Sequence, residues 1–386
     1  MRFLVAPLAP LTLALPALAL AAGACTDDTA RPGPDPDPGP EQLELRMTAT
    51  IPAGAEVEYC QFVTVPETWV TRDAVDFTAG SHHVLVYQTP YAAIPTQKEN
   101  GKVVDTSGVF DCSDGATNGW KVTKLVGGSQ NQTGESFLSF PEGVGVRLGG
   151  VLLMNVHYRN GSDAPLTTDV KVRFDTEAAD QISQEGDVLF LFNPLISVPP
   201  GHTASAHWRC PVYRDITIVN AQSHMHARGV GYEARVDGQA PFYVNDRWEG
   251  VPVKNFESLT VKAGSTLDYH CDYRNTGATP VYMGPRTTDE MCMLIGSYYP
   301  ADPRTANCLD ASGNLPGGEW IGTGEATCQQ TMGCIQEAQG LQAITDCMLA
   351  ASPAVAHESS ELLRCFIGAD DPLAQCGPQI QACVTR

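Results

Sequence analysis

The chain has 386 residues, a length that suits two or three domains, and 43% of them are hydrophobic, which is enough to fill real cores. Charged residues make up only 18%, whereas glycine (36) and proline (28) are frequent, so the composition favours a turn-rich β protein and excludes a wholly disordered chain. The formal net charge of −20 argues against a broad surface for nucleic acid or anionic membranes.

The first 24 residues have the features of an export signal. Arg2 precedes an apolar run from Phe3 to Ala22, and small residues stand before Cys25. This end resembles the lipobox of bacterial lipoproteins, so we predict a signal peptide over residues 1–24 and a lipid anchor on Cys25. Secretion after cleavage nearby is the alternative, because Ala22 stands where such boxes usually carry leucine. The expected location is the periplasm, the outer membrane or the cell surface, with the anchor as the only membrane contact.

Residues 25–42 are rich in proline, glycine and aspartate and hold nothing that a core could bury, so they should be a disordered linker. The chain has 13 cysteines, and setting Cys25 aside leaves 12. An even number in an exported chain predicts six disulfides.

From Leu43 to about Cys308 the pattern is one of strands and turns. Apolar and polar residues alternate with period two in runs that include Leu43–Met47, Val170–Phe174 and Leu267–Tyr273. Such runs indicate half-buried antiparallel strands, as in a β-sandwich. A proline- and glycine-containing stretch near residues 193–201 divides the region. We therefore predict an N-terminal β-sandwich over residues 43–192 and a second over 193–310.

The last part of the chain, residues 311–386, differs in character. It contains six cysteines and few β-branched runs, and Cys328–Ala350 and Ser360–Ile367 have a helical pattern. These features predict a small, mainly helical domain that disulfides hold together because its core is small. The cysteine connectivity there stays open.

Five of the nine histidines fall in three short motifs. His224 and His226 stand two apart, so on a strand both imidazoles face one side and can converge on one ion. His82 and His83 are neighbours and could share an ion only at a strand end or bulge. His157 ends a hydrophobic strand. Taken singly, each motif is better explained by histidines that bind no metal.

A methionine continues the set, because Met291 stands directly before Cys292. Imidazole nitrogen suits copper, zinc, nickel and iron, whereas thioether sulfur selects Cu(I). Without the histidines, Met291 would be read as core packing.

The order of the four motifs HH, VHY, HxH and EMC resembles that of the copper type II, ascorbate-dependent monooxygenases, over roughly residues 43–309. The resemblance implies an all-β fold of two jelly-roll-like sandwiches and two copper ions in separate cages. Its first ligand set is His82, His83 and His157, for an electron-transfer copper. Its second is His224, His226 and Met291, for the copper that activates O2. Ascorbate or an equivalent would supply single electrons for hydroxylating a substrate C–H bond, with no catalytic residues beyond the ligands.

The resemblance also implies how the cysteines outside the tail pair. The expected bridges are Cys60–Cys112, Cys210–Cys308 and Cys271–Cys292. The six remaining cysteines would then pair among themselves in the tail.

Two further positions bear on the substrate. Peptide-hydroxylating relatives carry an arginine two residues before the HxH pair, and here that residue is Gln222. Asn155 stands where relatives often carry glutamine. Gln222 and Asn155 are thus candidate substrate-binding residues. A small organic or peptide-like substrate that is neutral or more apolar is expected, although Arg228 could replace the lost charge.

Two other functions fit the same residues. A copper-binding or copper-delivery lipoprotein would keep both sites without catalysis, and it is the main alternative. A surface adhesin or assembly component would use the β domains only as a scaffold and would bind no stoichiometric copper. In each case we expect a monomer without a nucleic-acid partner.

Overall fold

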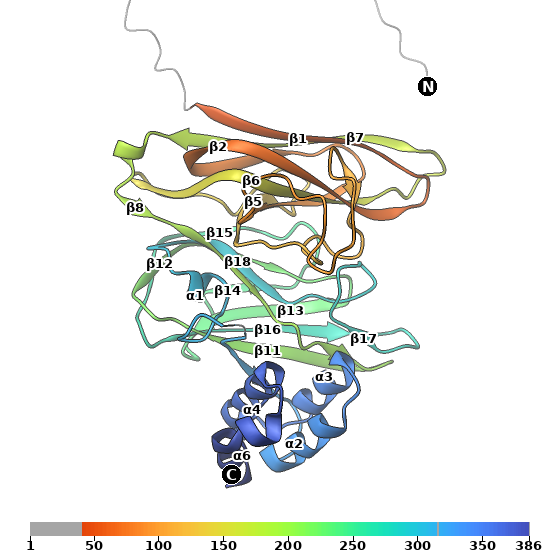
Figure 1. Cartoon of the computed structure of the whole chain (residues 1–386), viewed down its shortest axis with the longest axis vertical. Coiled ribbons are helices and arrows are strands. Elements are labelled where there is room, and N and C mark those ends of the chain that lie inside the picture. The colour runs from red at the N-terminus through yellow and green to blue at the C-terminus, as the bar shows by residue number, and fades with distance from the viewer. Residues whose placement is uncertain (1–40, 315, 386) are drawn as a thin grey trace, which may run out of the picture. The chain divides into compact units, whose positions relative to one another are not determined.

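The computed structural model describes residues 41–314 and 316–385. The predicted signal peptide, Cys25 and all but the end of the predicted linker lie outside the described residues. The described part is mainly antiparallel β-structure, with most of its helices near the C-terminus (Figure 1). This confirms the predicted fold class.

The first half forms an eight-stranded sheet with the order β1-β7-β2-β6-β3-β5, in which β4 pairs with β2 and β8 with β6. Its strands are β1 (Gln42–Ile51), β2 (Glu56–Asp76), β3 (Ser81–Gln88), β4 (Phe110–Asp111), β5 (Lys124–Ser129), β6 (Val144–Arg159), β7 (Leu166–Glu177) and β8 (Gln184–Glu185), with a 3₁₀ turn at Ala179–Gln181. The alternating runs predicted as strands lie in β1 and β7, and their apolar side chains are buried.

Two long strands give this sheet its bend. The pairing of β2 with β6 shifts register between Val65 and Thr68. Opposite this bulge stand Gly149 and Gly150, which both have positive φ angles (157° and 72°) that side chains disfavour. Because of the bend, strands predicted as a sandwich form one continuous, hydrogen-bonded sheet around a common core.

The second half is a sandwich of a five-stranded sheet, β14-β13-β16-β11-β19, on a four-stranded sheet, β15-β12-β18-β9. The strands of the two sheets are β9 (Asp187–Phe192), β11 (Thr203–Pro211), β12 (Ile216–His224), β13 (Gly229–Val236), β14 (Tyr243–Asn245), β15 (Lys254–Val261), β16 (Thr266–Arg274), β18 (Met293–Tyr299) and β19 (Glu319–Ile321). Strands β10 (Ser197–Val198) and β17 (Val281–Tyr282) form a separate two-stranded sheet.

Two strands lie across the predicted domain boundaries. Strand β9 pairs with β18 of the second sandwich, although we assigned residues up to 192 to the first. Strand β19, which we assigned to the tail, pairs with β11 of the same sandwich. Neither segment has an alternating pattern long enough to show its partner, since β19 is three residues long and β9 is apolar on both faces.

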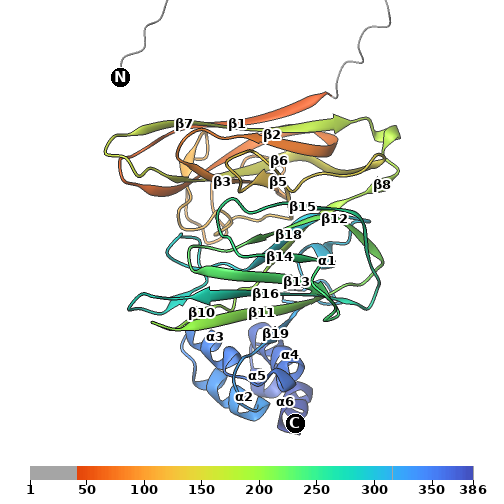
Figure 2. The same cartoon turned by 180° about the vertical axis from the view of Figure 1, so that it is seen from behind.

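The helices are α1 (Pro303–Ala306), α2 (Cys328–Glu337), α3 (Leu341–Leu349), α4 (Ala356–Gly368), α5 (Pro372–Gln375) and α6 (Gly377–Val384), with a 3₁₀ turn at Pro353–Val355. Helices α3 and α4 contact β19, and α2, α5 and α6 pack against these helices (Figure 2). The segment expected to be helical over Cys328–Ala350 forms two helices, because the backbone is extended at Ala338, which ends α2, and Gly340, with a φ angle of 87°, precedes α3. None of the helices in the described ranges is both long and apolar enough to cross a membrane.

The residues that the structure describes contain six disulfides. The three bridges implied by the resemblance, Cys60–Cys112, Cys210–Cys308 and Cys271–Cys292, are formed. The tail contains Cys328–Cys383, Cys334–Cys347 and Cys365–Cys376. Such a number of disulfides is consistent with an exported protein.

Candidate metal centre

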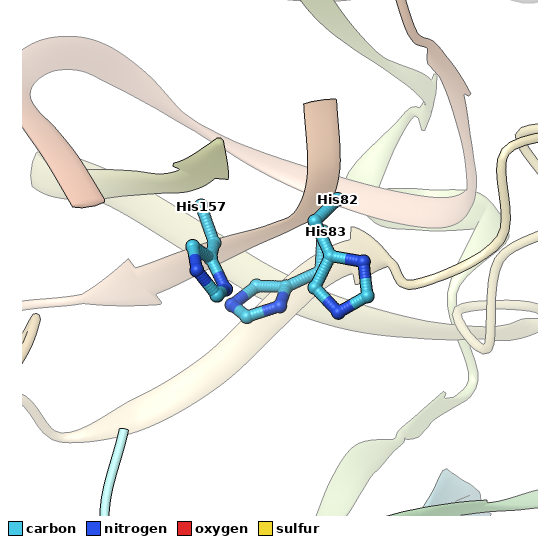
Figure 3. Close-up of side chains that lie close together, drawn as sticks. All are labelled: His82, His83 and His157. Atoms are coloured by element: carbon cyan, nitrogen blue, oxygen red, sulfur yellow. The ribbon is translucent and has the colours of Figure 1, made fainter. Parts of the chain in front are cut away.

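The first histidine set gathers where β3 begins and β6 ends. These strands are antiparallel neighbours, so His83 lies opposite His157. The register shifts between Ser81 and His83, and this irregularity lets the adjacent His82 and His83 approach the same side. Candidate ligand atoms of His82, His83 and His157 all lie within 4.8 Å of one another (Figure 3). The topology thus brings together the three predicted residues.

The imidazoles of this set have the neutral charge and the free lone pairs that a metal ion requires of its ligands. Burial lowers the pKa of His82 and of His157 to about 4, and it lowers the pKa of His83 well below its ordinary value. Neutral imidazole is the form that binds metals. The buried Nδ1 atoms of His83 and His157 have no hydrogen-bond partner in the structure. Because orphaned buried nitrogens are costly, the site fits an ion that would satisfy them.

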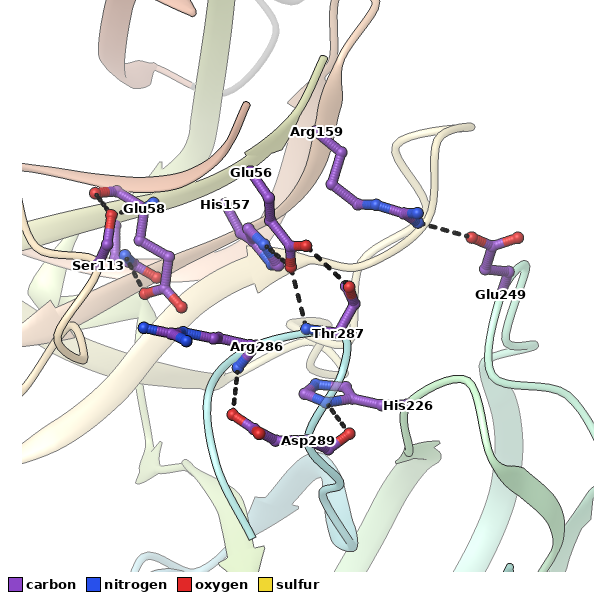
Figure 4. Close-up of polar contacts among 11 residues, drawn as sticks. Glu56, Glu58, Ser113, His157, Arg159, His226, Glu249, Arg286, Thr287 and Asp289 are labelled. Carbon is purple, nitrogen blue, oxygen red and sulfur yellow. Dashed lines mark hydrogen bonds and ion pairs between the residues drawn. The ribbon is translucent and has the colours of Figure 1, made fainter. Parts of the chain in front are cut away.

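A carboxylate orients one of these rings. His157 donates from Nε2 to Glu56 Oε1 at 3.0 Å, which leaves Nδ1 as the free lone pair. Glu56 also accepts from the backbone N–H and the hydroxyl of Thr287 in the second sandwich, at 3.0 and 2.9 Å (Figure 4). Burial opposes ionisation of Glu56, but the bonds from Thr287 and the nearby His157 hold its pKa below the ordinary value. Glu56 thus links the ring to the facing domain.

The HxH pair lies at the end of β12. The ring centroids of His224 and His226 are 5.1 Å apart. His224 donates from Nδ1 to Gln130 Oε1 at 2.7 Å, and His226 donates from Nδ1 to the Asp289 carbonyl at 3.1 Å. Both rings are buried, and burial lowers both pKa values. Each ring is therefore neutral with Nε2 free for a metal.

Glu290 holds the turn after this pair. Its carboxylate accepts from the backbone N–H groups of His226 and Arg228 at 3.0 and 2.7 Å. Burial nevertheless raises the pKa of Glu290 to about 7. These two hydrogen bonds connect the turn that follows His224 and His226 to the segment that carries Met291.

Met291 lies just before β18, and β18 pairs with β12 so that His224 stands opposite Met293. Tyr273 donates its hydroxyl to the Met291 carbonyl at 2.8 Å, and the adjacent Cys292 is bridged to Cys271. The Met291 side chain is half-buried and lines the same cavity as His83 and His224. His224 and Met291 thus line one cavity, whereas His226 lies outside its lining, and the second ligand set stays a prediction.

The two histidine sets are adjacent rather than separated. The ring centroids of His83 and His224 are 5.9 Å apart, so the two predicted sites meet at the contact between the sandwiches. Separate cages were expected from the resemblance. Gln130 explains the approach, because its amide bonds both His224 and the Ser223 carbonyl from across the contact.

An apolar cavity of about 370 Å³ adjoins this contact. Its walls come from both halves of the chain and include Leu85, Tyr87, Phe137, Phe190 and Ile295. Both candidate substrate residues, Gln222 and Asn155, line it. Asn155 donates to Glu58 Oε2 at 3.1 Å, whereas both polar atoms of the buried Gln222 amide lack a partner in the structure.

The remaining histidines lie elsewhere. His207 bonds Asp268 and has its ring 5.5 Å from that of His270, on the five-stranded sheet. His357 bonds Glu319 at 2.7 Å. His202 lies at the start of β11, where its carbonyl accepts from Asn275.

Sequence reasoning missed Glu56, Gln130 and the carboxylate of Glu290. Glu290 belongs to the EMC motif, so its place in the sequence could have drawn attention to it. Glu56 and Gln130 carry no such signal, because each lies far in sequence from the histidine it orients.

Comparison with known proteins gives two informative matches. Residues 188–314 match the family described as "Copper type II ascorbate-dependent monooxygenase, C-terminal domain". Over 256 residues the chain is 24% identical to the Homo sapiens protein named "Putative DBH-like monooxygenase protein 2", covering 59% of this chain and 48% of that protein. The chain thus spans about half the length of this relative. A structure of the coconut allergen cocosin aligns with 67% of this chain and 77% of its own at 8% identity, but its TM-score of 0.12 carries no weight.

Proposed function

The chain belongs to the copper type II, ascorbate-dependent monooxygenase family, and we propose that it hydroxylates a C–H bond of a small, largely apolar substrate. Two bound copper ions would supply the one-electron chemistry that reduces O2. His82, His83 and His157 would hold the electron-transfer ion through neutral imidazoles. His224, His226 and Met291 would hold the O2-activating ion.

The chain's own residues act by holding these ligands and positioning the substrate. Glu56, Gln130 and the Asp289 carbonyl each fix one nitrogen of a ring, so the other nitrogen faces the ion site. The apolar walls of the cavity exclude water and hold the apolar body of the substrate beside Met291 and His224.

The unpaired amide of Gln222 favours a substrate that carries a neutral polar group. Its buried amide offers one donor and one acceptor without partners in the structure, and leaving them unpaired costs about 1–3 kcal/mol per group. A carboxamide or hydroxyl on the substrate would satisfy them, whereas a carboxylate would bring a charge that the amide cannot balance. Asn155 would contact the substrate at the same cavity.

The observation that supports the proposal is that two adjacent sets of neutral histidines meet at an apolar cavity, which His83, His224 and Met291 line. A non-catalytic copper carrier has no need for the cavity with its orphaned amide. The six disulfides support export of the enzyme, and the lipid anchor on Cys25 stays a prediction.

Metal analysis and oxygen uptake test the proposal. The copper-loaded chain should bind two ions and consume O2 with ascorbate when given a neutral apolar substrate. His157→Ala should keep copper at the HxH site but lower hydroxylation about 100-fold or more. His357→Ala, which changes a histidine in the tail, should match the unaltered chain. Two bound coppers without turnover on a broad substrate panel would favour copper delivery instead.

A further inference from the structure

A second cavity, of about 360 Å³, lies beside His157 and is distinct from the apolar one. It opens between the two sandwiches, and hydroxyl, carboxylate and guanidinium groups take part in its lining. The residues that matter here are Glu56, Glu58, Ser113, His157, Arg286 and Thr288. It therefore reaches the first histidine set from a polar side.

Arg286 is the cation of this cleft. Its backbone N–H donates to Asp289 at 3.2 Å, but among residues 41–314 and 316–385 its guanidinium makes no hydrogen bond or ion pair. Figure 4 shows this side chain extending toward the side where Glu58 and Ser113 lie. An exposed, unpaired guanidinium in a cleft is well suited to bind an anionic oxygen.

The two carboxylates of the cleft do not cancel this cation. The oxygens of Glu56 are already occupied by His157 and Thr287. Glu58 Oε2 accepts from the Asn155 amide at 3.1 Å, so this carboxylate is also already bonded. Cu(II) held by neutral imidazoles would add two positive charges next to the cleft. In a chain with a net charge of −20, this is a local site for an anion.

We propose that this cleft binds the one-electron reductant as a small, oxygen-rich enediol anion of the ascorbate type. Arg286 holds the enediolate oxygens, and the hydroxyls of Ser113 and Thr288 bond the neutral hydroxyls. The proposal rests on the proposed function, because it assumes a reducible copper at the first histidine set.

The electron transfer balances as follows. Each reductant monoanion loses one electron and one proton and becomes its radical anion. The His157 ring would carry the electron to the first set, where it would reduce Cu(II) to Cu(I). The proton leaves to solvent through the open cleft. A second reductant anion supplies the second electron.

The first test measures reduction of the copper-loaded chain by rapid mixing with ascorbate and loss of the Cu(II) signal. Arg286→Gln should raise the ascorbate concentration for half-maximal reduction rate about tenfold or more, and Arg286→Lys should restore part of it. Arg247→Gln is the control, because Arg247 is exposed and lies outside the cleft lining. Uncharged hydroquinone should reduce all variants alike.

The second test measures binding without redox chemistry. Ascorbate titrated into the Zn(II)-loaded chain in a calorimeter should bind the unaltered chain and Arg247→Gln but not Arg286→Gln. The assignment of this cleft would be overturned if Arg286→Gln needed the same ascorbate concentration for half-maximal reduction as the unaltered chain. It would also be overturned if Arg286→Gln bound ascorbate as tightly as the unaltered chain. Neither measurement requires hydroxylation, so a chain that reduces its copper through Arg286 yet hydroxylates nothing would refute the proposed function and leave the reductant cleft standing.

Discussion

At the scale of single residues, burial decides how the candidate site works. The pKa of each of the five clustered histidines lies below its ordinary value because the rings are removed from water. A metal ion therefore does not have to displace protons at neutral pH. Oriented hydrogen bonds then set which nitrogen of His157, His224 and His226 is free.

Met291→Ala tests the role of the thioether. We expect the affinity for Cu(I) at the HxH site to fall about tenfold or more, since a soft ligand is lost, while the first histidine set keeps its copper. The copper stoichiometry shows which site loses its ion, and ascorbate-dependent oxygen uptake shows whether O2 is still consumed. Met283→Ala is the matched control, because Met283 also lines the apolar cavity. Normal oxygen uptake in Met291→Ala would show that Met291 only packs.

Gln222→Arg tests substrate discrimination. An arginine at this position would pair with a carboxylate, so preference should move from neutral substrates toward carboxylate-bearing ones by about tenfold or more. The ratio of kcat/KM values for a matched amide and acid pair measures it. An unchanged ratio would remove Gln222 from the substrate site.

Asp73 gives a prediction about pH, away from the metal centre. Burial raises the pKa of Asp73 to about 7 from its ordinary 3.8, although it accepts from Gly128 N–H at 2.7 Å. The folded chain thus holds a proton that the unfolded chain releases, so this residue's contribution to stability falls as pH rises from about 4 to 7.

The isosteric Asp73→Asn variant removes that dependence. We expect it to raise the free energy of unfolding by about 2–4 kcal/mol at pH 8 and to change it little at pH 4. Denaturant unfolding at the two pH values measures this, with the exposed Asp163→Asn as control. Equal effects at both pH values would contradict the assignment.

At the scale of elements, β19 ties the tail to the second sandwich. Trp320 of β19 is buried, its ring stacks on Trp208 at 5.3 Å, and its Nε1 donates to Asn193 at 3.1 Å. Residues 319–321 therefore belong to the second sandwich rather than to a separate tail, because β19 completes a sheet that contributes to the core around β12 and β18.

Two truncations separate the strand from the helices. A chain that ends at residue 317 loses Trp320 and should be less stable by about 3–5 kcal/mol than one that ends at residue 325, which keeps β19. Thermal unfolding measures the difference, and copper binding by the longer truncation shows whether the site survives without the helices. Equal unfolding midpoints would show that β19 contributes nothing.

At the scale of the whole molecule, the contact between the sandwiches joins the two histidine sets. Cross-domain bonds from Gln130 to His224 and from Thr287 to Glu56 hold this arrangement. The described arrangement thus provides a short path between the two sets rather than a wide gap.

Electron paramagnetic resonance tests this arrangement. With His83 and His224 rings 5.9 Å apart, two Cu(II) ions should be close enough for strong dipolar broadening and a half-field signal. His224→Ala, which disrupts one site, should remove both features while the first copper remains. Two independent Cu(II) spectra in the unaltered chain would place the ions far apart.

Features that depend on local pattern could be predicted from the order of the residues. Period-two alternation identified β1, β7 and β16, because residues two apart on a strand share a face. The spacing of the histidine motifs, with Met291, was sufficient to indicate a copper family. Composition alone predicted a disulfide-rich helical end.

Which groups meet across long separations depends on how the chain packs in three dimensions. Glu56 reaches His157 and Gln130 reaches His224 from more than ninety residues away, so no spacing rule could connect them. The contact of His83 with His224 and the pairing of β19 with β11 likewise follow from how sheets pack. Packing depends on many weak contacts added over the whole chain. A sequence pattern shows only which face of its own strand or helix each residue occupies.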